Sequence, residues 1–314
     1  MKMTEKIFFS LESVYREPLE IKAFFFGDMS KKTICVMGAM RGNEVQQMYV
    51  CARLVQELKK LEINGQIAKN TGIMVIPCAN YHSMNIGKRF WAMDNTDINR
   101  MFPGYDLGET TQRIADGIFS EIQGFEYGIQ LASFYQPGRF LTHVKQMVTE
   151  FTTDDGLADF GLPYALKREP RPYDTTTLNY NWQLWNTKAY SLFTHSTDDM
   201  KEDSADNAVN AILRFMKNRG IINYPIHAGY VTSVIHESDM FQVHSPCGGI
   251  CRIKTKIGDV VERGQVIAEI LNPLTCEVLA EIKAPEKSTV FFHFASPLIV
   301  EGTVIFKLVK NEIL

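Results

Sequence analysis

The most constraining feature of this sequence is a regular alternation of strand-like and helix-like segments between about residues 20 and 220. Apolar runs rich in β-branched and aromatic residues, such as "LEIKAFFFGD" and "KTICVMGAM", are typical of strands. From Glu44 to Leu61 apolar residues instead recur every three or four positions, which predicts a helix with Asn43 as its N-cap. This alternation predicts an α/β fold with a largely parallel sheet flanked by helices.

The segments that follow the predicted strands are where a binding site is expected, because ligands of parallel sheets bind outside the carboxyl ends of the strands. Four such segments occur, at 38–44, 79–104, 130–143 and 193–198. The first contains "GAMRGNE", which joins an apolar strand to the amphipathic helix and carries Arg41 and Glu44.

The texture of the sequence changes after about residue 225, where short alternating runs are separated by glycine and proline. This pattern predicts a small all-β domain over 225–314, after an α/β domain over 1–224. The stretch "SPCGGICRIKTKIGDVVERGQVIAEI" resembles one half of a biotinyl/lipoyl-like barrel-sandwich hybrid, and "KAPEKSTVFFHFASPLIVEGTVIFKL" resembles the other. Around the turn between them, "NPLTCEVLAEIKAP" lacks the methionine-flanked lysine of biotin carriers. We therefore expect a lid or docking domain rather than a carrier.

Composition and charge argue against several classes of partner. The formal net charge of -3 and the sequence pI of about 6.2 give no reason to expect nucleic acid or an anionic membrane. No apolar run approaches the roughly 18 residues of a membrane helix, and the charged N-terminal segment does not read as a signal peptide. The six cysteines are expected to be reduced thiols. These features predict a cytoplasmic protein, for which a homo-oligomer stays open.

Two motifs resemble those of the succinylglutamate desuccinylase/aspartoacylase family, a relative of the zinc carboxypeptidases. "GAMRGNE" stands where that family has a glycine, a spacer and then His-Gly-x-Glu. "NYHSMNIGKRFWAMDNTDINRMFPG" resembles the segment with an Arg, then Asp-Gly, Asn-Leu-Asn-Arg and Phe-Pro-Gly, and its "DINRMFPG" is specific. The resemblance covers about residues 20–310. It implies a zinc-carboxypeptidase-like mixed sheet, a barrel-sandwich-like C-terminal domain, and zinc-dependent hydrolysis of N-acyl amino acids.

The resemblance also implies a pocket for a carboxylate. The family positions that hold the carboxylate of an N-acyl amino acid are taken here by Arg89, Asn99 and Arg100. A guanidinium pairs bidentately with a carboxylate, and an asparagine offers an amide one donor and one acceptor. A small carboxylate-bearing ligand is therefore the expected partner. In the alternative interpretation, Arg89 and Arg100 form ordinary ion pairs with Asp94 or Asp97.

Most of the zinc site implied by the resemblance is replaced. Arg41 and Ala132 stand where the two ligand histidines are expected, and Phe193 or Thr194 stands where the catalytic glutamate is expected. Only Glu44 remains of these four roles. An arginine has no lone pair to give and stays protonated, and one carboxylate cannot hold zinc against competition. We therefore expect no cofactor, and no hydrolysis by a mechanism that needs zinc-activated water and a carboxylate base.

The position of Arg41 predicts a different role for its side chain. It lies three residues before Glu44 in a tight turn, so its guanidinium would fill the space of the missing ion and neutralise the carboxylate. The alternative is that Arg41 points into solvent.

Two other functional hypotheses stay open. In the first, Glu44 and two of His82, His143 and His195 form a relocated metal site, and the chain is an active zinc-dependent hydrolase of N-acyl amino acids or related amides and esters. In the second, the chain is a structural or interaction subunit whose groove is filled by its own side chains. The sequence therefore leaves open whether the chain is an enzyme.

Overall fold

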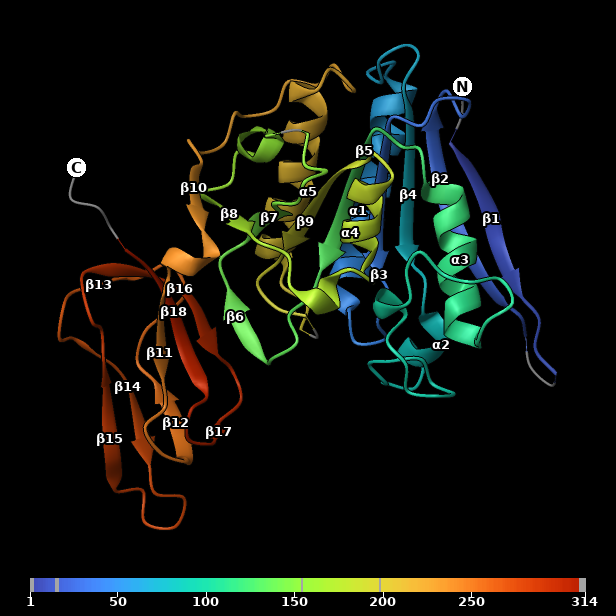
Figure 1. Cartoon of the computed structure of the whole chain (residues 1–314). Helices are drawn as coiled ribbons and strands as arrows, with labels where there is room; N and C mark the ends of the chain where they lie inside the picture. Colours follow the sequence, from blue (N-terminus) through green and yellow to red (C-terminus); the bar gives the residue numbers. More distant parts are fainter. Residues whose placement is uncertain (1–2, 15–16, 154, 198, 311–314) are drawn as a thin grey trace. The chain divides into compact units, whose positions relative to one another are not determined.

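The computed structural model describes residues 3–14, 17–153, 155–197 and 199–310, and the chain divides into two compact units (Figure 1). The first consists of residues 1–133 and 142–235, and the second of 134–141 and 236–314. The boundary predicted between 224 and 225 differs from this division in two places. The backbone N–H groups of Tyr230 and Ser233 donate to carbonyl oxygens of the first unit, so this segment stays with it. Residues 134–141 join the second unit because β6 (Gly138–Phe140) pairs there with β16 (Ser288–Phe294).

The first unit is built on a nine-stranded mixed sheet with the order β1-β2-β4-β3-β5-β9-β7-β8-β10. The central pairs β4–β3, β3–β5 and β5–β9 are parallel, as is β7–β8, whereas β1–β2, β2–β4 and β9–β7 are antiparallel. This confirms the predicted α/β fold with a largely parallel sheet. The strands are β1 (Thr4–Leu11), β2 (Leu19–Gly27), β3 (Ile34–Ala39), β4 (Gly72–Cys78), β5 (Tyr127–Ala132), β7 (His143–Met147), β8 (Tyr164–Arg168), β9 (Lys188–Phe193) and β10 (Ser233–His236).

Helices cover both faces of this sheet (Figure 1). Helices α1 (Val45–Ile63) and α5 (Glu202–Asn218) pack on one face, and α3 (Thr110–Ile122) and α4 (Leu178–Leu184) pack on the other. The remaining helical segments are α2 (Tyr81–Met84) and the 3₁₀ turns η1 (Ile98–Arg100), η2 (Gly156–Phe160), η3 (Pro172–Asp174) and η4 (Glu237–Asp239).

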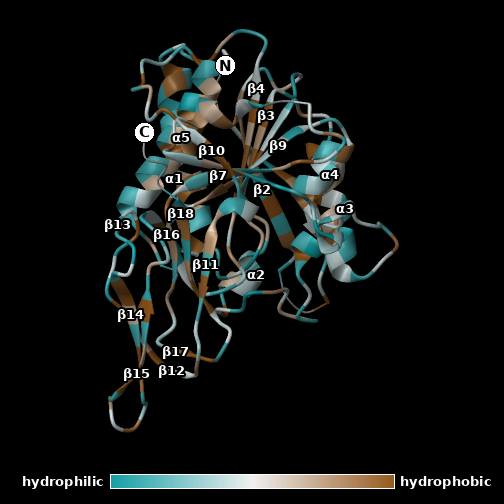
Figure 2. Cartoon of the chain, turned by 60° about the vertical axis from the view of Figure 1, so that its left-hand side comes forward, coloured by the Kyte–Doolittle hydropathy of each residue, from teal (hydrophilic) through white to brown (hydrophobic). Residues whose placement is uncertain are grey.

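Strand β3 shows why its sequence is continuously apolar. Ile34 and Val36 belong to the core beneath α1 and α5, while Cys35 and Met37 belong to the core beneath α3 and α4. Every residue of β3 is buried, as expected for a parallel strand covered on both faces. Figure 2 shows apolar residues along the strands of this sheet, whereas the helices mix apolar and polar residues.

The second unit is all-β, as predicted. One sheet has the order β11-β18-β16-β13, with β6 also paired to β16, and the other has the order β15-β14-β12-β17. Ile267 and Ile270 from one sheet share a core with Val290 and Phe306 from the other, so the sheets face each other. The further strands are β11 (Phe241–His244), β12 (Gly249–Ile253), β13 (Val260–Val261), β14 (Val266–Leu271), β15 (Val278–Lys283), β17 (Leu298–Ile299) and β18 (Val304–Lys310).

The structure also bears on the expectations about membrane helices and cysteines. Within the described ranges, no helix is both long enough and apolar enough to cross a membrane. The six cysteines are free thiols, three of them buried.

Candidate functional site

The turn between β3 and α1 places Arg41 and Glu44 at the carboxyl end of a central strand. The backbone N–H of Gly42 donates to the carbonyl oxygen of Arg89 over 2.9 Å, which ties the turn to the loop after α2. A Cβ atom on residue 42 would lie 2.1 Å from the carbonyl oxygen of Lys88, so only glycine permits this approach. Gly42 therefore holds the turn against this loop, and the backbone of the turn fixes the direction in which the Arg41 side chain leaves the sheet.

Arg41 lies between two carboxylates and is 6% exposed. Its Nη1 is 3.0 Å from Oε1 of Glu44, and its Nη2 is 2.8 Å from Oδ2 of Asp97. Its Nε also donates to both Asp97 oxygens, at 3.1 Å each. The predicted pairing of Arg41 with Glu44 is therefore confirmed, and the alternative in which Arg41 points into solvent is wrong, because two buried carboxylates hold the guanidinium inside.

Both oxygens of Glu44 are fully used. Oε2 accepts the backbone N–H groups of Met40 and Arg41 at 2.8 and 3.0 Å. Oε1 accepts Arg41 Nη1 at 3.0 Å and also the hydroxyl of Ser133. Glu44 is the N-cap residue of α1 instead of the predicted Asn43, but its side chain bonds backwards to the turn and forms no capping hydrogen bond. Four accepted hydrogen bonds exhaust the lone pairs of a carboxylate.

The charge of Arg41 is permanent in this setting. Burial alone would lower the pKa of Arg41, but the charges of Glu44 and Asp97, together with their hydrogen bonds, more than offset burial and raise it. A fixed cation thus sits against both carboxylates, and the oxygens of Glu44 have no lone pair left for a metal. These residues do not fit the zinc ion that the family resemblance implies.

The other positions of the implied zinc site supply no ligand or base either. Ala132 ends β5, its methyl side chain offers no ligand, and its carbonyl oxygen accepts Gln47 Nε2 at 3.2 Å. Thr194 is buried and donates its hydroxyl to the carbonyl oxygen of Ser196 at 3.0 Å. The ring of Phe193 stacks on the ring of His143. The position of the catalytic glutamate therefore carries no carboxylate.

The three histidines proposed for a relocated metal site come from three different segments of the chain. His82 on α2 stacks on Trp91, with ring centroids 5.9 Å apart. His143 is fully buried at the start of β7 and stacks on Phe193 at 5.0 Å. His195 follows β9, and its backbone N–H donates to Ser204 Oγ at 2.9 Å. Over the described part of the chain, no three or more His, Cys, Asp or Glu residues are grouped so that they could hold a metal ion.

Two of the three predicted carboxylate-binding residues, Arg89 and Asn99, are linked to the same turn. Arg89 is half-buried, donates to Asn43 Oδ1 at 3.5 Å, and lies over the ring of Phe90. Asn99 is buried; its backbone N–H donates to Asp97 Oδ1 at 3.1 Å, and its side-chain oxygen accepts the N–H of Leu178. Asp97 therefore links Arg41 directly to the loop that carries Asn99.

Arg100 is held more loosely than Arg41. Its side chain is 33% exposed and its Nη1 lies 3.8 Å from Oδ1 of Asp174. Nη1 also donates to the carbonyl oxygen of Tyr173 at 2.8 Å, with the guanidinium over that ring. The alternative pairing of Arg100 with Asp97 is wrong, because Asp97 pairs with Arg41, whereas an ordinary ion pair of Arg100 does exist, with Asp174.

Sequence reasoning missed Ser133 and named Asp97 only as an alternative ion-pair partner of Arg89 or Arg100, not as the partner of Arg41. Asp97 stands inside "DINRMFPG", where it accepts the N–H of Asn99 as the N-cap of η1, so its motif position was the available signal. Ser133 follows β5 immediately, and its hydroxyl contacts both Arg41 and Glu44. Its place one residue after a strand end was the only hint.

Comparisons with known proteins agree with this fold and its motifs. The model of the succinylglutamate desuccinylase/aspartoacylase catalytic domain matches residues 30–183. An N-alpha-acetyl-L-2,4-diaminobutyric acid deacetylase of Halomonas elongata is 22% identical over 263 residues, covering 76% of this chain and 70% of that protein.

Solved structures extend the similarity of fold to the whole chain. A succinylglutamate desuccinylase from Silicibacter sp. TM1040 superposes with a TM-score of 0.80 at 17% identity, over 98% of this chain and 94% of that one. The ectoine utilization protein EutE (DoeB) from Ruegeria pomeroyi gives 0.78 at 16% identity, over 98% and 95% of the two chains. With its matched catalytic-domain model and its deacetylase relative, this chain belongs to the succinylglutamate desuccinylase/aspartoacylase family.

Proposed function

We propose that this chain is a family member that binds a small carboxylate without hydrolysing it. The observation that carries the proposal is the ion pairing of Arg41 with Glu44 and Asp97, at 3.0 and 2.8 Å. Relatives in the family are deacylases by name, including a deacetylase of N-acetyl-diaminobutyric acid and a desuccinylase. The resemblance assigns their chemistry to zinc, and this chain places a guanidinium beside the one remaining ligand.

A guanidinium replaces the positive charge of a metal ion but not its chemistry. A zinc ion with an open coordination position binds water and lowers the pKa of that water to about 7. Arg41 has no coordination position, and its donors are engaged by Glu44, Asp97 and Ser133. The proton-transfer step lacks a carboxylate as well, since Thr194 or Phe193 occupies that place. Hydrolysis by the family route is therefore not expected.

Binding of an anion needs a guanidinium that still has donor groups to offer to a ligand. Arg41 serves two buried carboxylates and has no charge to spare for a ligand. Arg100 keeps a third of its side chain exposed, and its Nε and Nη2 carry no hydrogen bond within the described residues. A planar fork of this kind suits a carboxylate. We assign ligand contact to Arg100 on this ground, and to Arg89 because it stands at a family position for the carboxylate. Asn99 holds the loop between Arg100 and Arg41.

Titration calorimetry with a panel of N-acetyl amino acids tests this proposal. We expect binding to the wild-type chain, at least about tenfold weaker binding to Arg89→Ala/Arg100→Ala, and no release of acetate in either case. Arg113→Ala removes an exposed arginine of α3 and is the matched control. Absence of binding by the folded wild-type chain would favour the structural-subunit hypothesis. Turnover abolished by a chelator would establish the relocated-metal hypothesis instead.

A further inference from the structure

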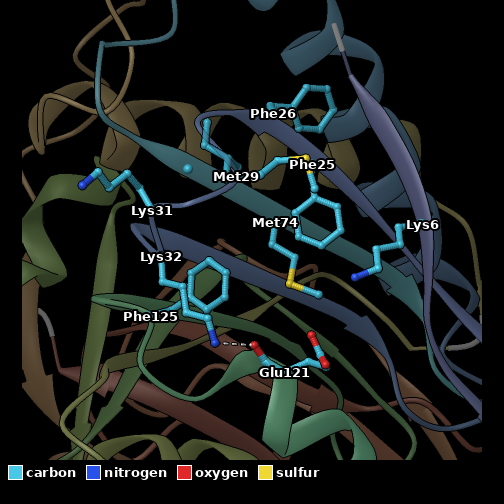
Figure 3. A pocket seen from close by; sticks show the side chains of 11 residues that line it. Lys6, Phe25, Phe26, Met29, Lys31, Lys32, Met74, Glu121 and Phe125 are labelled. Atoms are coloured by element: carbon cyan, nitrogen blue, oxygen red, sulfur yellow. Dashed lines mark hydrogen bonds between the residues drawn. The ribbon is translucent and has the colours of Figure 1, made fainter. Parts of the chain in front are cut away.

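A pocket lies in the first unit, at the end of the sheet where β3 and β4 begin (Figure 3). Arg41, in contrast, follows the other end of β3. The pocket has a volume of about 150 Å³. Its walls come from β1, β2 and β4, from the segment between β2 and β3, and from the end of α3. None of its lining residues belongs to the candidate site described above.

Apolar side chains line one part of this pocket, where the core extends beyond the end of α3, and polar and charged groups line the rest. Phe25 on β2 and Met74 on β4 are cross-strand partners on the face covered by α3. Helix α3 ends at Ile122, and Phe125 continues the cover only in part. Met74 and Phe125 are nearly inaccessible, but Phe25 is only half-buried and Met29 at the rim is 49% exposed. Two phenyl rings and two thioethers thus form an open apolar recess.

Charges of both signs flank the recess. Figure 3 shows the ammonium of Lys6 and the carboxylate of Glu121 directed toward the space beside Met74. Within the described residues neither of these two side chains forms a hydrogen bond or an ion pair. Lys32 is different: its Nζ donates to the carbonyl oxygens of Glu121 and Gln123 at 2.9 Å each and so caps the end of α3. Lys31 also lines the pocket, but Figure 3 shows its ammonium directed away from the space beside Met74. Lys6 and Glu121 are therefore the cation and the anion that face this space.

We propose that this pocket binds a free L-α-amino acid with an apolar side chain of the size of leucine or phenylalanine. The carboxylate of the ligand pairs with Lys6, its ammonium pairs with Glu121, and its side chain enters the recess between Phe25 and Met74. A cavity of about 150 Å³ with apolar walls accommodates benzene in a protein core, so a single phenyl or isobutyl group fits and a larger one does not. Met29 and Met74 adapt to either shape because methionine is flexible.

NMR of the ¹³C-labelled methionine methyl groups in the full chain tests the site with L-phenylalanine as the probe. We expect saturable shifts of the Met29 and Met74 methyl signals and no shift of Met216, which is buried in the core under α1 and α5. N-acetyl-L-phenylalanine lacks the ammonium and L-phenylalaninamide lacks the carboxylate, and they mimic the two ends of a peptide. Each is expected to bind at least about fivefold more weakly. Equal affinity of the three compounds would overturn the proposal.

Two variants assign the charges. Lys6→Gln and Glu121→Gln are each expected to weaken L-phenylalanine binding about fivefold, because both groups are exposed and screened by solvent. Lys59→Gln on α1 and Glu301→Gln in the second unit are the matched controls and should bind like the wild type. Arg89→Ala/Arg100→Ala should also leave the Met29 and Met74 shifts unchanged, so this test is independent of the carboxylate-binding proposal. Wild-type affinity in both Lys6→Gln and Glu121→Gln, or no saturable shift with L-phenylalanine, would contradict the assignment.

Discussion

At the scale of single residues, the guanidinium of Arg41 is the structural centre of the site. It pairs with the carboxylates of Glu44 and Asp97, whose side chains are 2% and 10% exposed, so that each carboxylate has a counterion where little water reaches it. A buried ion pair gains little net stability relative to apolar residues, but removal of one partner leaves a buried charge uncompensated. Arg41 is thus needed as the counterion of these two carboxylates, whatever ligand the site binds.

Replacing Arg41 by alanine should therefore be strongly destabilising. We expect Arg41→Ala to lower the free energy of unfolding by about 3–5 kcal/mol, because Glu44 and Asp97 then lie buried without a counterion. Urea denaturation followed by circular dichroism measures this change. The exposed Arg113→Ala should change the same quantity by less than about 0.5 kcal/mol. A loss below about 1 kcal/mol in Arg41→Ala would show that the three charges are hydrated rather than mutually dependent.

The sequence predicted only the local half of this arrangement. Arg41 and Glu44 are three residues apart in one turn, so their pairing follows from spacing. Asp97 lies 56 residues from Arg41, and only the folded sheet brings the two together. Ser133 reaches the site for the same reason, because β5 lies beside β3. Contacts between the ends of neighbouring parallel strands are not encoded by any periodicity in the sequence.

At the scale of elements, the buried strands were predictable and the peripheral ones were not. Strands β3 and β4 are nearly continuous apolar runs, and β5 and β9 are mostly apolar, and the structure has all four. Strand β7 reads "HVKQM" and β8 reads "YALKR", with too few apolar residues to be recognised by pattern. Their pairing with β9 and with each other depends on the tertiary arrangement. The barrel-sandwich-like repeat was predictable because its turns carry glycine and proline.

The close packing of β3, α1 and β4 has a consequence for alkaline stability. Burial raises the pKa of the Cys51 thiol on α1 above its ordinary value of 9.0. Its contribution to stability is fully present below pH 9 and is lost as the pH rises, because the unfolded thiol ionises while the folded one does not. Between pH 7.5 and pH 10 the wild type should therefore lose about 1.4 kcal/mol more than Cys51→Ala.

Urea denaturation at the two pH values measures that difference. Cys276→Ala, which removes an exposed cysteine in the second unit, is the control and should follow the wild type at both pH values. An identical pH dependence in Cys51→Ala and the wild type would mean that the Cys51 thiol is accessible to hydroxide in the folded chain.

At the scale of the whole molecule, the chain crosses between its two units three times, after residues 133, 141 and 235. The sequence placed a single boundary at 224, since composition changes there, but residues 134–141 also belong to the second unit. Strand β6 in this segment pairs with β16 through Phe140 and Arg139. Phe140 is 3% exposed and packs on Phe292 with ring centroids 4.6 Å apart. The segment reads "FYQPGRFL", which has no regular pattern that would have predicted its place in the second unit.

Truncation after residue 235 should therefore not yield a well-behaved first unit. The truncated chain leaves β6 without its partner strand and exposes the Phe140 ring, so we expect aggregation in size-exclusion chromatography with light scattering. Replacing residues 134–141 of the truncated chain by a Gly/Ser linker of equal length should restore a monodisperse species. A monodisperse truncated chain without the linker would show that β6 does not need the second unit.

The measurement that tests the central claim most directly is the zinc content of the purified wild-type chain. Protein prepared without chelator or metal-affinity tag is incubated with stoichiometric zinc, dialysed, and analysed by plasma mass spectrometry. Because Arg41 lies against Glu44 and Asp97, we expect less than about 0.1 zinc ion per chain. Close to one zinc ion per chain, retained through dialysis, would contradict the account and return the chain to the hydrolases of its family.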